Sequence, residues 1–276
     1  MRHSYITAAA LALALTSCAK ARNYTDPLGP RFAGEQGVLS DPDPALRIVT
    51  FNIAYGRKIE QAIECLGAAP LRGADIVLLQ EMHAPGAEEI AGALSMNYVY
   101  YPSSIRPGEK DMGVAVLSQW PIKASEKLIL PHQTRVVHRG RIATIATVDI
   151  NGVAVRVYSL HFGSPFGLSG GQRGDQAEAV LADARQWPGP VIVAGDLNSR
   201  SVGKRFEAAG FSWLTKSVGK TVGPFSFDHV FVRGLPGAGT AGVARECKDA
   251  SDHSPVWATL RGTAGPEARD AGPAAH

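Results

Sequence analysis

Short apolar runs rich in β-branched residues recur along the chain and are separated by polar turns, which is the pattern of many short strands. The runs that predict strands are 46–53, 75–80, 97–101, 112–118, 142–150, 153–160, 191–195, 227–232 and 255–260. Asn151-Gly152 stands between two of these runs, and this dipeptide is the strongest short signal for a β-hairpin. We therefore expect 142–150 and 153–160 to pair antiparallel, so the sheet structure is not purely parallel.

Three other segments carry apolar residues at helical spacing. These residues are Ile59, Ala62, Ile63 and Leu66 in the first segment, Ile90 and Leu94 in the second, and Ala177, Val180, Leu181, Ala184 and Trp187 in the third. Strands joined partly by helices and partly by hairpins fit two packed mixed sheets with helices on the outside. The pattern thus predicts an α/β protein with a four-layer sandwich.

The N-terminus has the features of an export signal. Arg2 is followed by an apolar stretch from Ile6 to Leu15 that is too short to span a bilayer, so residues 1–17 predict a signal peptide. The run ending at Cys18 resembles the bacterial lipobox, which makes Cys18 the expected site of lipidation. In the lipoproteins that it resembles, a residue other than Asp after the cysteine favours the outer membrane, and Ala19 stands there. The alternative is an ordinary secretory signal and a soluble secreted or periplasmic protein.

The remaining chain divides into three parts. Residues 18–45 are polar and rich in Pro and Gly, which predicts a lipidated N-terminus followed by a flexible tether. Residues 46–261 are enough for one domain with a large core, and residues 262–276 predict a disordered tail because they lack an apolar period. Outside the lipobox, Cys65 and Cys247 remain, and export permits either a disulfide or two buried thiols.

Charge says little about the substrate. The net charge of +3 is too small to indicate a nucleic-acid-binding protein by itself. One basic segment, 123–141, is compatible with a groove for a polyanion or with an ordinary solvated loop, and it lacks interleaved aromatic residues for base stacking. Within it, Arg139 and Arg141 are the residues that we expect to meet a phosphate.

Six polar segments follow apolar runs, where strands deliver side chains to a common edge. They are Asn52 in TFNIAYG, Glu81 in IVLLQE, His161 in YSLHFG, GDLN at 195–198, Phe227-Asp228-His229, and Ser251-Asp252-His253. Taken alone, Glu81 is compatible with a surface carboxylate and Asn52 with a turn residue. Their oxygen ligands nevertheless suit Mg²⁺ or Mn²⁺, and a cysteine-rich or multi-histidine zinc pattern is absent from the sequence. The set predicts a hard-metal site beside groups for acid–base chemistry.

The ordered set of segments resembles the endonuclease/exonuclease/phosphatase superfamily, from about Leu46 to Leu260. Its members include deoxyribonuclease I, abasic-site endonucleases, neutral sphingomyelinases and inositol-phosphate phosphatases. The resemblance implies a deoxyribonuclease I-like four-layer sandwich of two mixed β-sheets flanked by helices. It also implies a metal-dependent hydrolase that acts on phosphate ester bonds, with Asn52, Glu81 and Asp252 on the Mg²⁺ or Mn²⁺ ion.

The resemblance distributes the acid–base work over the other polar residues. It places Asp196 on the attacking water, Asn198 on that water or a phosphate oxygen, and His161 on the phosphate or the leaving group. Asp228 is the partner that would orient His253. Relatives assign the general base either to the aspartate of GD-x-N or to the histidine of SDH, and we prefer Asp196 as base with His253 stabilising the phosphate.

The leading functional prediction is a phosphodiesterase or nuclease that uses metal-activated water. A phospholipid phosphodiesterase similar to sphingomyelinases is the first alternative, and the short apolar loop Phe162–Leu168 is its candidate feature. A noncatalytic protein tethered to the membrane as a binding or scaffold module is the alternative of another class. The expected partners are accordingly a phosphate ester, in nucleic acid or phospholipid, and a membrane surface.

Overall fold

Two mixed β-sheets lie at the centre of the molecule in the computed structural model, which describes residues 21–37, 45–105, 110–235 and 238–261. The first sheet has the order β1 (Arg22–Asn23), β5 (Asn97–Ile105), β6 (Asp111–Ser118), β4 (Ile76–Met82), β3 (Ala45–Asn52), β14 (Val256–Arg261) and β13 (Ala238–Val243), and β2 (Phe32–Gly34) also pairs with β5. The second has the order β11 (Ser212–Trp213), β12 (Asp228–Arg233), β10 (Val191–Asp196), β9 (Val153–His161), β8 (Arg141–Ile150) and β7 (Ile122–Leu130).

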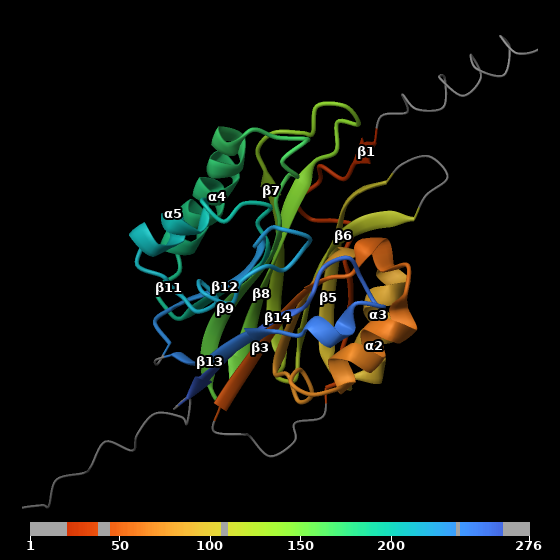
Figure 1. The fold of residues 1–276 in the computed structure, drawn as a ribbon, viewed down its shortest axis with the longest axis vertical. Helices are drawn as coiled ribbons and strands as arrows, with labels where there is room; N and C mark the ends of the chain where they lie inside the picture. The colour runs from red at the N-terminus through yellow and green to blue at the C-terminus, as the bar shows by residue number, and fades with distance from the viewer. Residues whose placement is uncertain (1–20, 38–44, 106–109, 236–237, 262–276) are drawn as a thin grey trace, which may run out of the picture.

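Helices cover the outer faces of both sheets, so the fold has four layers (Figure 1). Helices α2 (Ile59–Gly67) and α3 (Ala84–Ala93) pack on the first sheet, and α4 (Gly170–Arg185) and α5 (Gly203–Ala208) pack on the second. Two single-turn helices, η2 (Ala54–Gly56) and η3 (Arg245–Cys247), follow β3 and β13. This arrangement confirms the predicted α/β sandwich of two mixed sheets.

The central strands are apolar on both faces because each face meets another layer. In β4, Val77 and Leu79 pack with the helical cluster, whereas Ile76 and Leu78 pack in the cluster between the sheets. Successive side chains of a strand point to opposite faces, so an apolar run without alternation is what a strand buried on both sides requires.

Two parallel strand pairs bring polar side chains to one edge. Strand β3 runs parallel to β4, with Asn52 opposite Gln80, and β9 runs parallel to β10, with His161 opposite Asp196. Strand β12 is antiparallel to β10, and its first residue, Asp228, also lies opposite Asp196. The carboxyl ends of four strands and the start of a fifth therefore converge.

The predicted hairpin is confirmed, since β8 and β9 pair antiparallel with Ile150 opposite Val153. Several elements were not predicted, namely the strands β1, β2, β7, β11 and β13 and the helix α5. Strand β7 occupies much of the basic segment 123–141, whose polar residues hid its alternation. Its Lys127 is 4% exposed and donates from Nζ to the carbonyl oxygens of Tyr24 and Gly29, so this part of the segment is not a solvated loop.

The described part of the predicted tether is also structured, which corrects the expectation of a flexible 18–45 segment. Strands β1 and β2 both pair with β5, because the edge of the first sheet offers backbone groups that a short extended segment can satisfy. The signal peptide, Cys18 and the 262–276 tail lie outside the described residues. Among the helices of the described ranges, none has the length and apolarity needed to cross a membrane.

Cys65 and Cys247, whose pairing the sequence left open, form a disulfide with their Cα atoms 5.5 Å apart. The bond joins α2 to η3, immediately before the loop that carries Ser251 to His253. Lys58 adds a second tie, because its Nζ donates to the Asp249 carbonyl at 2.7 Å. The loop that supplies His253 is thus held against the start of α2.

Candidate active site

The convergent strand ends place the predicted polar residues together in a largely buried site. Asn52 is the last residue of β3, His161 of β9 and Asp196 of β10, and their exposed fractions are 1%, 4% and 1%. Asp228 is fully buried at the start of β12. Charged and amide groups are rarely buried at this level unless they are paired with one another or serve a ligand.

Unusual backbone conformations aim two of these side chains. Glu81 has φ 55° at a register shift in the pairing of β4 with β6, which is a β-bulge that turns its carboxylate out of the strand pattern. Gly195 has φ 150°, and a Cβ there would lie 2.0 Å from the Leu160 carbonyl oxygen of the neighbouring strand. Glycine is therefore required just before Asp196.

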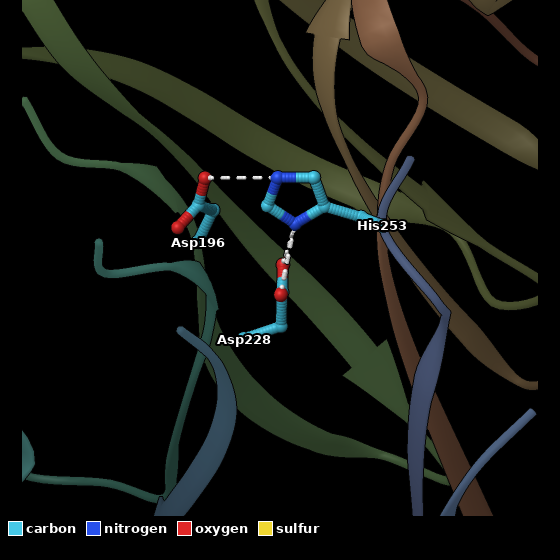
Figure 2. A group of neighbouring side chains, drawn as sticks. All are labelled: Asp196, Asp228 and His253. Carbon is cyan, nitrogen blue, oxygen red and sulfur yellow. Dashed lines mark hydrogen bonds and ion pairs between the residues drawn. The ribbon is translucent and has the colours of Figure 1, made fainter. Parts of the chain in front are cut away.

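Asp228, His253 and Asp196 form a chain of contacts, and Figure 2 shows one ring nitrogen of His253 facing each carboxylate. His253 Nδ1 lies 2.9 Å from Asp228 Oδ2 and 3.2 Å from Oδ1, and Nε2 lies 3.9 Å from Asp196 Oδ2. Ser251 Oγ accepts from the His253 backbone N–H at 3.1 Å, and Thr221 Oγ1 accepts from that of Asp228 at 3.3 Å. Both ends of the Asp228–His253 pair are thus fixed.

Asp196 is the point where the other site residues meet. Its Oδ2 accepts from Asn52 Nδ2 at 3.2 Å and from Asn198 Nδ2 at 3.1 Å, and its Oδ1 accepts from the Asn198 backbone N–H at 2.8 Å. His161 Nε2 lies 3.6 Å from the same Oδ2 and 3.8 Å from Glu81 Oε1. The structure therefore brings Asn52, Glu81, His161, Asp196, Asn198, Asp228 and His253 into one network.

The protonation states inside this network are shifted from their ordinary values. Burial, together with the neighbouring Asp228 charge, raises the pKa of Asp196 to about 7. Burial by itself lowers the pKa of His253, but the adjoining Asp228 carboxylate outweighs it and raises that pKa to about 10. At neutral pH the site thus pairs a carboxylate near its midpoint with a cationic imidazole.

His161 behaves differently from His253. Burial and the nearby cations Arg141 and His253 hold the pKa of His161 well below its ordinary value, so the ring is neutral. Arg141 Nη1 lies 3.4 Å from His161 Nδ1. Because a guanidinium only donates, Nδ1 is the acceptor and the ring proton is on Nε2, which faces Glu81 and Asp196.

A cavity of about 580 Å³ opens in front of the network and is lined by residues that include Glu81, Asp252, His253, Tyr55, Lys58 and Lys248. Asp252 is exposed in this cavity, and its charge is among the causes that raise the pKa of Glu81, after burial as the largest. Both carboxylates line this cavity, and Asn52, whose amide oxygen accepts from the Ala54 N–H at 3.1 Å, is hydrogen-bonded to Glu81 beside them. This donor set fits a hard divalent cation.

Asp196, Asp228 and His253 offer a second set of metal-compatible atoms. The ligand atoms of Asp196, Asp228 and His253 lie within 4.8 Å of one another, and all three residues are buried. However, His253 Nδ1 is already engaged by Asp228, which leaves Nε2, 3.9 Å from Asp196 Oδ2, as the available nitrogen of the ring. We interpret this group as the acid–base part of the site.

Arg139 and Arg141 lie beside the network rather than in a solvated loop. They are 6% and 7% exposed, and both line a smaller cavity of about 230 Å³. Arg139 Nη1 donates to the Tyr55 hydroxyl at 3.4 Å. Burial lowers the pKa of Arg141, although the Glu81 carboxylate opposes that shift.

Tyr55, Ser251 and Thr221 were not predicted as site residues. Tyr55 lines both cavities and lies in η2 with φ 65°, a conformation that no local sequence pattern announced. The one available signal for Ser251 was its place in the Ser-Asp-His segment. Thr221 offered no such signal, because its contact with Asp228 depends on how the residues between them fold.

Comparison with known proteins places the fold. A family protein from Leptotrichia buccalis is 18% identical with a TM-score of 0.64, covering 78% of this chain and 99% of that one. A protein from Beutenbergia cavernae is 21% identical with a TM-score of 0.65, covering 79% and 71%. Sphingomyelinase C from Streptomyces griseocarneus is 21% identical with a TM-score of 0.61, covering 79% and 100%. No curated protein matches the chain. Residues 49–253 match the model of the Endonuclease/Exonuclease/phosphatase family, and the chain therefore belongs to that family.

Proposed function

We propose that the chain is a divalent-metal-dependent phosphoesterase that hydrolyses a phosphodiester with water activated at Asp196. The observation that carries this proposal is the buried Asp228–His253–Asp196 group at the edge of a cavity with carboxylate donors. A carboxylate with a pKa near 7 is suited to accept a proton at neutral pH, and a cationic imidazole is suited to face an anion.

Glu81, Asn52 and Asp252 are the residues that would hold the cation. When bound, Mg²⁺ or Mn²⁺ supplies positive charge that offsets the negative phosphate oxygens during attack. The protein contribution is the placement of these oxygen donors next to Asp196, to which Asn52 is hydrogen-bonded at 3.2 Å.

The acid–base residues have separate tasks. His253 Nε2 and Asp196 Oδ2 are 3.9 Å apart, which is too long for a direct hydrogen bond and allows both atoms to contact one phosphate or its attacking water. Asp228 keeps His253 cationic, so His253 stabilises the phosphate oxygens. Asn198 fixes the Asp196 carboxylate, and neutral His161 donates from Nε2 toward the leaving oxygen.

Arg141 and Arg139 supply positive charge on the far side of His161 and would bind a substrate phosphate oxygen. Arg141 contacts His161 at 3.4 Å, so an anion on Arg141 lies next to the acid–base group. A nucleic acid and a phospholipid both provide such an anion. The phospholipid alternative is favoured by Phe166, which lines the cavity of these arginines and is 96% exposed.

We also propose that the protein is exported, that Cys18 is lipidated, and that the enzyme acts at the outer membrane. The support is the sequence of the first residues, with a short apolar stretch that ends at a lipobox cysteine. Detection of an acylated Cys18 by mass spectrometry of the mature N-terminus tests this part, and an unmodified N-terminus would favour the soluble alternative.

The function is tested with the mature protein, its His253→Gln variant and a His132→Gln control. His132 is a partly exposed histidine paired with Asp175 at 2.7 Å, so its replacement should leave activity unchanged. Cleavage of DNA, RNA, sphingomyelin and bis(p-nitrophenyl) phosphate is measured with Mg²⁺, Mn²⁺ or a chelator. Metal-dependent cleavage lost only in His253→Gln supports the proposal. Folded, metal-binding protein without activity on any of them would favour the scaffold alternative.

A further inference from the structure

The first described residues are fixed to a loop beside the smaller cavity. Ala21 N–H donates to the Val137 carbonyl at 2.9 Å, Asn23 Nδ2 donates to the His138 carbonyl at 2.8 Å, and Gly140 N–H donates to Asn23 Oδ1 at 2.8 Å. Strand β1 continues this attachment by pairing with the end of β5. Figure 1 shows β1 at the same end of the molecule as the loop that follows β7. The chain thus enters the domain at the wall of this cavity.

Two loops at this wall present large apolar side chains to solvent. Val136 is 79% exposed and Phe166 is 96% exposed, and both line the cavity that contains Arg139 and Arg141. The loops are tied together, because Arg135 N–H donates to the Gly167 carbonyl at 3.2 Å. Arg173 also holds the second loop by donating to the Leu168 carbonyl at 2.6 Å. The apolar rim of Val136 and Phe166 is therefore built on supported backbone.

The distance from the expected anchor to this rim is short. Cys18 precedes Ala21 by three residues, which span at most about 10 Å when fully extended. A tether of the length expected from 18–45 would leave the domain free to face any direction. Because Ala21 is fixed to Val137, an acyl chain on Cys18 would instead enter the bilayer close to Val136.

We propose that the rim of Val136 and Phe166 docks on the phospholipid surface that anchors Cys18, so that the cavity of Arg139 and Arg141 opens onto lipid headgroups. The exposed cations Arg135 and Arg57 flank the two cavities and favour an anionic surface. The docking rests on the proposed lipidation and goes beyond the proposed reaction. It would direct the enzyme toward phosphate esters presented at the membrane.

The test uses single cysteines in the full chain, produced with its signal and reconstituted into vesicles of phosphatidylcholine and phosphatidylglycerol. Val136→Cys and Phe166→Cys are compared with Val153→Cys, whose side chain is 38% exposed at the start of β9. His161 at the other end of that strand is about 26 Å away, so Val153 reports the opposite end of the molecule. Cys65 and Cys247 are bonded to each other, which leaves the introduced thiol for a fluorescent label.

Nitroxide-bearing lipids should quench the labels at 136 and 166 several-fold more than the label at 153. Replacing both Val136 and Phe166 by Ser should lower vesicle affinity by at least about ten-fold, because two apolar side chains lose their burial in the lipid. Equal quenching at all three positions, or an unmodified Cys18, would overturn the proposal. Labels at 136 and 166 that respond to added DNA but not to vesicles would overturn it in favour of a nucleic-acid surface.

The failure of docking is distinguishable from failure of the proposed reaction. Hydrolysis of soluble bis(p-nitrophenyl) phosphate needs no membrane, whereas quenching of the labels needs no turnover. An active protein with unquenched labels would therefore refute the docking alone. An inactive protein with quenched labels at 136 and 166 would support the docking and refute the reaction.

Discussion

Two buried arginines in the second sheet have opposite surroundings. Arg156 on β9 is 8% exposed and binds Glu126 at 2.9 and 3.1 Å and Asp183 at 3.0 Å. Burial alone would lower its pKa, but the hydrogen bonds to Glu126 and Tyr158 raise it. Arg141 on β8 is 7% exposed, faces neutral His161, and has an Nε without a hydrogen-bond partner among the described residues.

The difference separates stability from function within one sheet. Arg156 has its anions supplied by the protein, so it serves to join β7, β9 and α4. Burial of the Arg141 charge costs free energy, and the hydrogen bonds and anions of the protein compensate this cost only in part. Such incomplete compensation is typical of a group that meets a charged ligand. Residues around Arg141 should therefore affect activity more than stability, and residues around Arg156 should do the reverse.

The largest expected effect is on turnover, from Asp196→Asn. Loss of the proton acceptor should reduce kcat by about 10³-fold, the range of general-base catalysis. The unfolding free energy should stay equal or rise, because a buried carboxylate with a raised pKa is replaced by a neutral group of the same shape. Steady-state kinetics and thermal unfolding measure the two quantities. A kcat within ten-fold of the original would remove Asp196 from the role of base.

His229 extends the comparison to a buried base away from the reacting atoms. It is fully buried against Trp213, and burial lowers its pKa to about 4 from the ordinary 6.5. Between pH 4 and pH 6.5 the folded state therefore binds fewer protons than the unfolded state. The contribution of His229 to the free energy of unfolding is complete above pH 6.5 and is lost as the pH falls to 4. The total is roughly 3 kcal/mol.

Urea unfolding at several pH values tests this, with His229→Gln as the matched variant that cannot titrate. The difference in unfolding free energy between the two proteins should change by that amount across the interval. A constant difference would show that His229 does not titrate with the fold.

Arg156→Met should lower the unfolding free energy by about 2–3 kcal/mol while kcat and KM remain close to their original values. The estimate is below the range of about 3–5 kcal/mol for a broken buried ion pair because Glu126 is 55% exposed and can be rehydrated. The control is Arg185→Met, which breaks an exposed pair with Glu178 and should cost below about 1 kcal/mol. Equal losses in both variants would contradict a structural role for Arg156.

The smallest expected effect comes from Arg141→Lys. A lysine keeps the charge but loses the planar fork, so kcat/KM should fall about ten-fold, with unfolding free energy unchanged. Kinetics on a soluble phosphodiester and urea unfolding check both parts. A loss of stability with unaltered kinetics would place Arg141 in the same class as Arg156.

The central architecture could be predicted because its information is local. Runs such as the one that forms β4 are apolar on both faces, and the Asn151-Gly152 turn specifies its own hairpin. Strand β7 escaped prediction because an edge strand needs little apolar alternation, and its Lys127 is buried only by contact with Tyr24 and Gly29. The attachment of the N-terminal segment at Ala21 also escaped prediction, because it depends on a contact with Val137, which is far away in the chain.

By itself, the sequence determined which apolar runs form the central strands and in what order they follow along the chain. It also determined the polar residues that end those strands and the family resemblance that assigns their roles. Only the tertiary structure decided that Cys65 bonds Cys247, that Asp196 faces His253, and that Tyr55 stands between two cavities. Periodicity and turn chemistry act over a few neighbouring residues, so sequence reveals them. The protonation of His253 and the only partly matched charge of Arg141 depend on groups far apart in the chain, whose distances exist only after the sheets pack.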